Sequence, residues 1–599
     1  MIRGFIDFDT LDRNQSFDQL DLHEGVLLPG LQLEHDGAGI RAFTRGRQAL
    51  LIQGQPRIRD AALARRIERE GWAVALTRLS ESADEFLGQL AGRFSLLWLD
   101  LATGRIGFAS DRFNTYGFCY ANEGRRLSFA DRANEVPALQ REVDPQGVFD
   151  YLYFHAIPAP GTIFKGIYRL EPGARLLADR ERTQLAAWWQ PRFEEPADAD
   201  FPHSADTFKT LIKNAVEREL DGRPVGAFLS GGTDSSTVVG MLARSGNPLT
   251  AYSIGFEAEG YDEMEFARIA AKHFGVKHRP YYITSDDLVT HIPAVAASYD
   301  QPFGNSSVLP AYLCAKLAHD DGHGKMFAGD GGDELFGGNT RYAKQRVFGY
   351  YEKIPGLIKG GLLEPVIMQT PLGKLPLMRK AASYIEQANT PLPERTARYN
   401  LIYRLGMENI FPGDFISAVD ADAPIKLQRR VWQNSTAQSL VNKMLNFDWR
   451  FTLADNDLPK VIGSTRLAGM DVAFPLLDDD LLDFSLKLPP EYKLKGLQLR
   501  WFFKEALRDF LPPEIITKKK QGFGLPYGHW VLKHRGLENL ARESLDILVE
   551  RNILRRDFVA ELFKTHLPAF PGYYGEMVWI SMMLGQWLAQ HASPARTTK

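Results

Sequence analysis

Cysteine is almost absent from this chain, which has only Cys119 and Cys314 among its 599 residues. Two cysteines cannot build a disulfide framework or a cysteine-based zinc site, so both kinds of scaffold are excluded. Long apolar runs are missing too, since none reaches the roughly 18 residues of a membrane-spanning helix. The first residues, MIRGFIDFDTLDRNQ, contain acids and no apolar core segment, so no signal peptide is expected. We therefore expect a cytoplasmic protein with no membrane partner.

An excess of charge of one sign is also missing. The chain has 71 Lys and Arg against 74 Asp and Glu, a formal net charge of -3. A nucleic-acid or membrane-surface binder would show a basic excess, so neither partner is expected. The composition, 44% hydrophobic and 24% charged, is typical of a globular protein. The length exceeds one ordinary core, so two or more domains are expected.

The clearest boundary lies at residues 191–206, where PRFEEPADADFPHSAD is rich in Pro and Asp. This composition predicts a linker between a first domain, residues 1–190, and a second, residues 207–599. Before the linker, RFSLLWLDLATGRIGFASDR alternates and turns at Thr103 and Gly104, which predicts a β-hairpin. The first domain is therefore expected to be rich in sheet.

After the linker, short apolar strands alternate with helices. The expected strands are 225–229, 249–256, 278–284 and 325–330, and the expected helices are 235–244, 261–275 and 307–322. This alternation predicts an α/β domain with a doubly wound parallel sheet. Ligands of such sheets bind at the carboxyl ends of the strands, where SGGTDSS and GDGGDE fall. From about residue 340 the pattern predicts helical additions.

The first chemical motif is SGGTDSS, residues 230–236, between a strand and a helix. Glycines let backbone N–H groups approach a phosphate, and the helix N-terminus adds partial positive charge. The loop has no lysine of the GxxxxGK[ST] kind. Its carboxylate, Asp234, is explained if it holds Mg²⁺ that also binds phosphate oxygens. The alternative is a plain glycine turn with an Asp-Ser helix cap.

The second motif is AGDGGDELFGG, residues 328–338, which places Asp330, Asp333 and Glu334 on one tight turn. Close carboxylates repel each other, so this group needs a cation or a proton. A Mg²⁺ shared by Asp234 and Asp333 would satisfy both loops. The alternative is a calcium-like or merely solvated turn.

SGGTDSS resembles the pyrophosphate-binding loop of the ATP pyrophosphatase superfamily. Together with YSIGF, YDEMEFARIAAKHFG, DQPFGNSS, GDGGDELFGG and NDLPKVIGSTRLAGMDVAFPLLDDDLLDF, it resembles the asparagine synthetase family from about Ala91 to Trp587. The resemblance implies an ATP-pyrophosphatase fold for the second domain. It also implies an enzyme that uses ATP and Mg²⁺ to adenylate a carboxylate, releases pyrophosphate, and joins the acyl group to an amine with release of AMP.

The resemblance also implies the residues of the site. Leu229, Ser253 and Gly255 would lie along the adenosine. The implied nucleotide-binding residues are Leu229, Ser230, Gly231, Gly232, Asp234, Ser235, Ser253, Gly255 and Gly331, and the implied metal ligands are Asp234 and Asp333.

Two catalytic residues are implied by position. Lys520, before Gly522 and Phe523, matches a family lysine that could stabilise the charge of the pentacoordinate phosphate and then the oxyanion. The alternative is a basic surface cluster, because Lys518 and Lys519 adjoin it. Asp330 matches an acidic or tyrosyl residue that helps to deprotonate the amine.

The first domain differs from that of family members that hydrolyse glutamine. They begin Met-Cys-Gly and use the cysteine as nucleophile, whereas this sequence has Ile2. Cys119 lies far along the chain, and LLIQGQPRIRD lacks the Asn-Gly-Glu that holds glutamine. We expect a degenerate class II glutamine amidotransferase-like domain with an Ntn-type α+β fold.

A degenerate glutaminase beside an intact synthetase predicts another amine. β-Lactam synthetases have a tyrosine where Asp330 stands, which disfavours them. By elimination we expect an isopeptide-bond-forming cyclase of lasso peptides, which the resemblance implies closes a macrolactam on a trimmed precursor. Holding both ends of the peptide in one pocket makes the amidation nearly unimolecular. A leader peptidase or leader-binding protein would then be its partner. The alternatives are an ammonia-dependent asparagine synthetase or other small-molecule amide ligase, and a non-catalytic scaffold.

Overall fold

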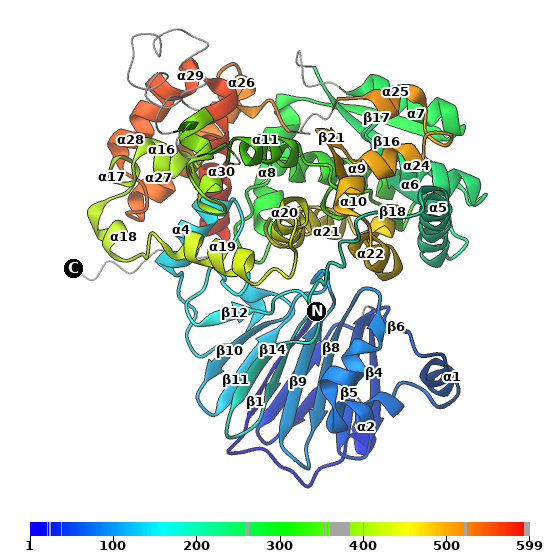
Figure 1. The fold of residues 1–599 in the computed structure, drawn as a ribbon. Helices are drawn as coiled ribbons and strands as arrows, with labels where there is room; N and C mark the ends of the chain where they lie inside the picture. The colour runs from blue at the N-terminus through cyan, green and yellow to red at the C-terminus, as the bar shows by residue number, and fades with distance from the viewer. Residues whose placement is uncertain are drawn as a thin grey trace.

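The computed structural model describes residues 1–20, 22, 25–37, 39–257, 263–352, 354–355, 358–359, 384–398, 400–519 and 524–591. Figure 1 shows a sheet-rich lower part built from the N-terminal third of the chain, and an upper part of helices around a third sheet. None of the described helices is long and apolar enough to cross a membrane.

The lower part contains two six-stranded antiparallel sheets. The first has, in spatial order, β12 (Ile167–Arg169), β10 (Cys119–Glu123), β11 (Arg126–Ala130), β1 (Ile2–Asp7), β3 (Leu31–His35) and β2 (Val26–Leu28). The second has β14 (Thr183–Ala187), β13 (Ala174–Ala178), β9 (Arg105–Ser110), β8 (Phe94–Asp100), β5 (Gln48–Gly54) and β4 (Ile40–Arg45). A short pair joins β6 (Arg57–Ile58) to β7 (Leu90–Ala91).

The two sheets pack face to face, because apolar side chains alternate with polar ones along their strands. Leu31, Leu97 and Phe129 belong to the core between them. Helices cover the outer face of the second sheet, where Leu96 packs with Leu79; they are α1 (Ala61–Glu70), α2 (Val74–Glu81) and α3 (Ala83–Gly88). The outer face of the first sheet packs on α4 (Pro145–Phe154).

The predicted hairpin is confirmed, since β8 and β9 pair from Ser95 and Ser110 to Asp100 and Arg105. The predicted linker needs a correction. Residues 191–200 are neither helix nor strand, but α5 (Phe201–Arg218) includes residues 201–206. Asp200 accepts a hydrogen bond from the amide of His203, and proline is tolerated in the first turn of a helix, so the Pro- and Asp-rich stretch ends as a helix start.

The upper part contains the predicted parallel sheet, in the order β17 (Lys277–Ile283), β16 (Leu249–Phe256), β15 (Val225–Phe228), β18 (Lys325–Phe327) and β19 (Asp471–Ala473). All four pairings are parallel. Both faces are covered, one by α6 (Thr233–Arg244) and α7 (Met264–Phe274), the other by α8 (Ser285–Ser298) and α9 (Val308–Asp320). The strand order reverses at β15, the switch point where such folds bind ligands.

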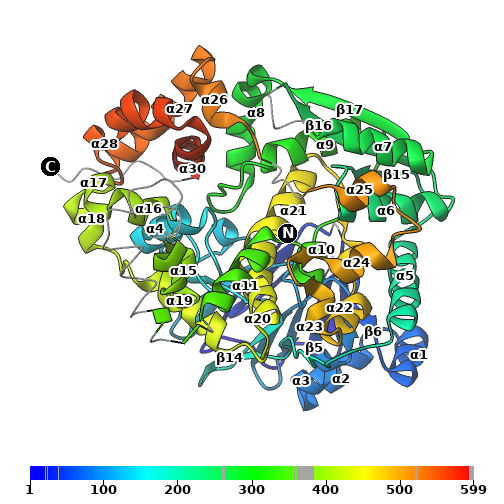
Figure 2. The same ribbon diagram turned by 45° about the horizontal axis from the view of Figure 1, so that its top comes forward.

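The remaining helices surround this sheet, as Figure 2 shows. They are α10 (Gly332–Phe336), α11 (Thr340–Glu352), α15 (Glu394–Ala397), α16 (Leu401–Leu405), α17 (Met407–Ile410), α18 (Gly413–Ser417), α19 (Ala423–Gln433), α20 (Leu440–Asp448), α21 (Leu458–Leu467), α22 (Asp479–Leu486), α23 (Pro490–Lys493), α24 (Trp501–Ala506), α25 (Pro513–Thr517), α26 (Tyr527–Val531), α27 (Arg535–Glu550), α28 (Arg556–Glu561), α29 (Leu567–Ala569) and α30 (Pro571–His591). Short 3-10 helices lie at Phe17–Gln19, Ala133–Glu135 and Pro475–Leu477, π-helical segments at Trp449–Asp457 and Leu562–His566, and a small hairpin joins β20 (Leu494–Lys495) to β21 (Gln498–Leu499).

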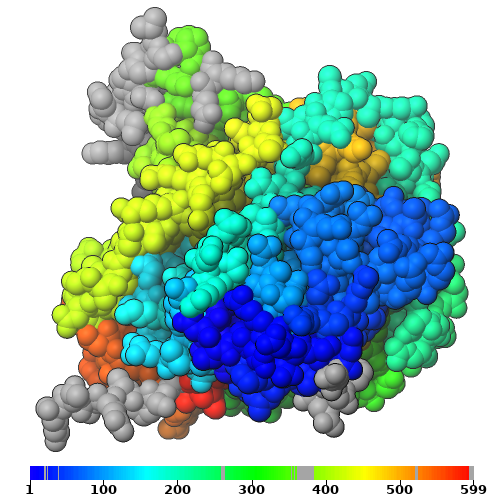
Figure 3. Space-filling model, turned by 90° about the horizontal axis from the view of Figure 1, so that it is seen from below, coloured from blue at the N-terminus to red at the C-terminus, as the bar shows by residue number. Residues whose placement is uncertain are grey.

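The two parts are in direct contact, and the view from below shows the blue N-terminal segments packed against the rest of the molecule (Figure 3). Arginines of the lower part meet the acidic segment 478–483 around the start of α22. Arg112 lies 3.1 Å from both Asp479 and Asp483, and the Arg112 and Asp479 side chains are only 6% and 3% exposed. Arg59 pairs with Asp483 at 2.5 Å. We call this group of ion pairs the interdomain clamp.

Candidate active site

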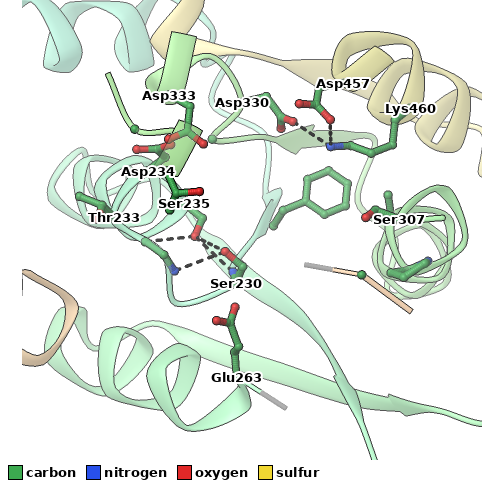
Figure 4. A pocket seen from close by; sticks show the side chains of 18 of the residues that line it. Ser230, Thr233, Asp234, Ser235, Glu263, Ser307, Asp330, Asp333, Asp457 and Lys460 are labelled. Carbon is green, nitrogen blue, oxygen red and sulfur yellow. Dashed lines mark hydrogen bonds and ion pairs between the residues drawn. The ribbon is translucent and has the colours of Figure 1, made fainter. Parts of the chain in front are cut away.

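The loops after β15 and β18 meet at the carboxyl edge of the sheet, as the sequence predicts. A Cβ on Gly332 would lie 2.5 Å from Cγ of Asp234, so only glycine allows the two loops to approach this closely. Both loops line one cavity of about 1410 Å³, drawn in part in Figure 4.

The loop 230–236 is held by its own serines. The hydroxyl of Ser235 lies 3.1 Å from that of Ser230 and accepts from the Ser230 amide at 3.2 Å (Figure 4). Helix α6 starts after Gly232, which has no side chain to cap the first N–H groups. These N–H groups give the helix start at the cavity edge a partial positive charge, which favours a bound anion.

Two of the three residues expected along an adenosine line the cavity. Leu229 and Ser253 line the cavity, and the Ser253 hydroxyl donates to the carbonyl of Leu229. His278 lies 2.8 Å from the same hydroxyl. Gly255 is buried within β16 and does not belong to the cavity lining. Gly231 of the phosphate loop does not belong to the lining either. Its carbonyl accepts a hydrogen bond from Lys518 at 3.3 Å.

Asp234 and Asp333 do come together, but the cation between them is the guanidinium of Arg500, which contacts both carboxylates. Burial raises the pKa of Asp234, and Arg500 opposes that rise. Arg500 is 6% exposed and has a φ of 53°, an uncommon conformation for a residue with a side chain. The sequence alone does not indicate a role for Arg500, since a lone arginine before α24 belongs to no recognisable motif.

The carboxylate pair fits a magnesium ion in its chemistry. Mg²⁺ is bound in proteins through one or two carboxylates, with phosphates and water supplying the other oxygens. Among the described residues no group of three His, Cys, Asp or Glu side chains could hold a metal alone. Asp234 and Asp333 would therefore hold the ion together with a nucleotide, and Arg500 would have to give up part of its contact with them.

Asp330 belongs to the same loop after β18 as Asp333, but it pairs with Lys460 at 3.2 Å (Figure 4). Lys460 also binds Asp457 at 3.0 Å, at the end of the π-helical segment. Burial raises the pKa of Asp330, while the Lys460 ammonium opposes this rise. Lys460 stands in the motif NDLPKVIG, and the sequence alone predicts no role for it.

Lys520, the predicted catalytic lysine, lies outside the described residues. Its neighbours Lys518 and Lys519 line the cavity, as does Lys504 of α24. Lys518 pairs with Glu263 at 3.2 Å, and both side chains are nearly buried. Gly331 has a φ of 102°, in the left-handed region. It packs so closely on Leu477 that a Cβ there would lie 2.1 Å from the Leu477 side chain.

Neither cysteine of the chain presents a reactive thiol. Cys119 is buried on β10, and burial raises its pKa to about 12. Cys314 is buried on α9, and burial raises its pKa as well. A thiol whose pKa is raised is a poor nucleophile at neutral pH, because the thiolate is the reactive form.

Known proteins resemble this chain over most of its length. Residues 207–589 match the family model of asparagine synthase, and residues 72–189 match that of a glutamine amidotransferase domain. The chain is 24% identical over 502 residues to the glutamine-hydrolyzing asparagine synthetase 1 of Bacillus subtilis, covering 82% of this chain and 77% of that protein. It is 30% identical over 278 residues to the putative glutamine-hydrolyzing asparagine synthetase 2 of Methanocaldococcus jannaschii, covering 45% and 53%. The chain belongs to the asparagine synthase family and is an ATP-dependent carbon–nitrogen ligase with an N-terminal glutaminase-like domain.

Proposed function

We propose that this ligase closes a macrolactam on a peptide, as lasso peptide cyclases do. The observation that favours a peptide is the size of the cavity, about 1410 Å³. Pockets that enclose one drug-sized ligand measure about 300–1,000 Å³, so a nucleotide leaves room for a second molecule.

In the first half-reaction, a carboxylate oxygen of the peptide attacks the α-phosphorus of ATP, and the bond to pyrophosphate breaks. Ser230, Ser235 and the N-terminus of α6 would bind the phosphates, and Arg500 and Lys504 would neutralise their charge. Mg²⁺, when bound by Asp234 and Asp333, supplies further charge neutralisation. Lys520 would act on the same charge.

In the second half-reaction, the peptide amine attacks the acyl carbon, and AMP leaves with the electron pair of the broken C–O bond. The amine must lose a proton, and Asp330 is the candidate acceptor, because burial makes its carboxylate more basic. Lys460 holds Asp330 in place. A leader peptidase or leader-binding protein would supply the trimmed peptide.

Asparagine synthesis is the second candidate function, because the relatives with the same domain pair are named glutamine-hydrolyzing asparagine synthetases. The buried state of Cys119 and Cys314 speaks against their serving as the glutamine-attacking thiol. Ammonium ions would then be the nitrogen source.

One experiment separates these functions. The purified protein is incubated with ATP, Mg²⁺ and either a trimmed candidate peptide, aspartate with ammonium, or aspartate with glutamine, and AMP, pyrophosphate and product mass are followed. A peptide that loses one water as AMP forms supports the cyclase, whereas asparagine with no change in peptide mass overturns it. Asp234→Asn should stop pyrophosphate release, and the exposed Asp221→Asn should not.

A further inference from the structure

The cavity extends from the phosphate loop to a separate group of residues near the C-terminus. We call this end the second lobe; its lining includes Leu525, Pro526, Tyr527, Pro571, Glu576, Trp579 and His155. Both ribbon views show α26 and α30 together on one side of the molecule and α6 and α25 on the other (Figures 1 and 2). The second lobe is thus distant from the phosphate loop but belongs to the same cavity.

The polar group of the second lobe is a pair, His155 and Glu576, whose Nδ1 and Oε1 lie 3.3 Å apart. Glu576 is 54% exposed in its side chain, so its carboxylate is accessible from the cavity. The hydrogen bond from His155 lowers the pKa of Glu576, and the carboxylate stays ionised at neutral pH.

His155 is fixed by its backbone. It follows α4 with a φ of 63°, its amide donates to Tyr151 at 2.7 Å, and its carbonyl accepts from the amide of Gly304 at 2.8 Å. Trp579, three residues after Glu576, donates from Nε1 to the Gly304 carbonyl at 2.9 Å. Gly304 therefore hydrogen-bonds both to His155 and to Trp579, which lies one helical turn after Glu576.

The wall that bears Glu576 is also rigid. A Cβ on Gly575 would lie 2.5 Å from Cα of Gly528, so α26 and α30 touch through their backbones. Apolar side chains line this end of the cavity, among them Leu525, Tyr527 and Trp579. A half-exposed carboxylate beside apolar side chains can accept hydrogen bonds from an ammonium group, and the charges on both partners strengthen these bonds.

The second lobe connects to the reaction centre through the residue after Gly304. The side-chain amide of Asn305 donates to Oδ1 of Asn456 at 2.6 Å. The adjacent Asp457 binds the same Lys460 that pairs with Asp330. One short segment, Gly304–Asn305, thus contacts both ends of the cavity.

We propose that the His155–Glu576 pair binds the ammonium group of the amine substrate before it reacts. The inference rests on the amide-forming reaction proposed above, in which an amine is the second reactant. The carboxylate accepts hydrogen bonds from the ammonium, His155 orients the carboxylate, and the apolar walls contact the carbon chain next to the amine. A peptide would enter with its amino terminus in the second lobe and its carboxylate at the phosphate loop.

The test compares two forms of one candidate peptide, with a free and with an acetylated amino terminus. ATP–pyrophosphate exchange is measured for each, because adenylation of the carboxylate does not require the amine to react. For the wild-type enzyme, the half-saturating concentration should be about tenfold lower for the free peptide than for the acetylated one, as expected for a charged hydrogen bond. In Glu576→Gln this ratio should fall to about one.

Two further variants sharpen the result. His155→Asn should lower the ratio partly, and asparagine tolerates the left-handed backbone there. Glu561→Gln removes the carboxylate of another His–Glu pair, with His566 at 3.7 Å, which is not part of the cavity lining, and should keep the wild-type ratio. A ratio near ten in Glu576→Gln overturns the inference, and so does an equal loss in Glu561→Gln.

If no peptide supports exchange but aspartate does, the proposed peptide function fails and the inference is still tested. Asparagine formation is then titrated with ammonium chloride. A half-saturating ammonium concentration about tenfold higher in Glu576→Gln than in the wild type supports the ammonium site, and an unchanged concentration overturns it.

Discussion

The guanidinium of Arg500 bridges two carboxylates that would otherwise repel each other across the loop contact. Its position lets the two loops lie close together. It also means that a metal bound by Asp234 and Asp333 would enter a place that already contains a positive charge. Binding of Mg²⁺ and movement of Arg500 should therefore be coupled.

Replacing Arg500 by methionine tests this coupling. The variant removes the guanidinium from two partly buried carboxylates, which costs about 3 kcal/mol and should lower Tm by several degrees. Mg²⁺ should then raise the Tm of Arg500→Met more than that of the wild type, because the ion binds the vacated carboxylates. Thermal unfolding with and without Mg²⁺ measures both effects, and the exposed Arg555→Met is the control. An equal Mg²⁺ effect in both proteins contradicts the assignment of the metal ligands.

Lys493, shortly before Arg500 in the chain, is a second buried basic residue. Its side chain is 1% exposed and donates to Oδ1 of Asn442 at 2.9 Å. Burial lowers its pKa to about 7, against an ordinary 10.5, and Glu195 opposes this shift. The unfolded chain therefore binds the proton more tightly than the native protein.

The sign of the pH effect follows from that difference. A depressed pKa adds stability that is fully present above the unfolded pKa and is lost as the pH falls through the folded pKa. The Tm of the wild type should thus fall relative to that of Lys493→Met as the pH is lowered from about 10 to about 7. Parallel Tm profiles of the two proteins over this range would show that Lys493 is charged in the fold.

At the scale of single elements, the loops at the sheet edge determine the site. The sequence predicts them well because glycine and aspartate cluster directly after apolar strands, and β16 is found at the predicted residues 249–256. It does not predict Arg500 or Lys460. Each is a single basic residue in or beside a helix, and its partner lies more than a hundred residues away in the chain. Only the packing of α21 against α9 and β19, and of α24 against α5 and α23, brings these cations to the carboxylates.

The close approach of the two loops can be tested at Gly332. In Gly332→Ala the new Cβ would overlap the Asp234 carboxylate, so that carboxylate must move, and ATP–pyrophosphate exchange should fall by about a hundredfold. Gly324→Ala is the matched control, since its Cβ would meet nothing within 4 Å. Equal exchange rates in the two variants would mean that the Asp234 position does not matter for adenylation.

At the scale of the whole molecule, the glutaminase-like domain is bound to the synthetase domain by buried charges. The interdomain clamp uses the segment 478–483, which follows Leu477, and Leu477 packs directly beneath Gly331 of the second loop. The first domain therefore supports the loop that carries Asp330 and Asp333, although it presents no reactive thiol among its described residues.

Arg112→Met should weaken this contact. It leaves Asp479 buried without its arginine, which costs about 3 kcal/mol, so Tm should fall by several degrees. Arg66→Met removes an exposed pair with Glu70 in the same domain and should change Tm by less than about one degree. Differential scanning calorimetry measures both, and an unchanged Tm in Arg112→Met would show that the clamp adds no stability.

The clamp has a consequence for anyone who recombines parts of this family. A glutaminase domain grafted in place of residues 1–190 would have to reproduce the arginines that contact 478–483, chiefly Arg59 and Arg112. A graft that lacks them would leave Asp479 and Asp483 exposed beneath the adenylating loop. The chimera would then lose ligase turnover even though no residue of its nucleotide site had been changed.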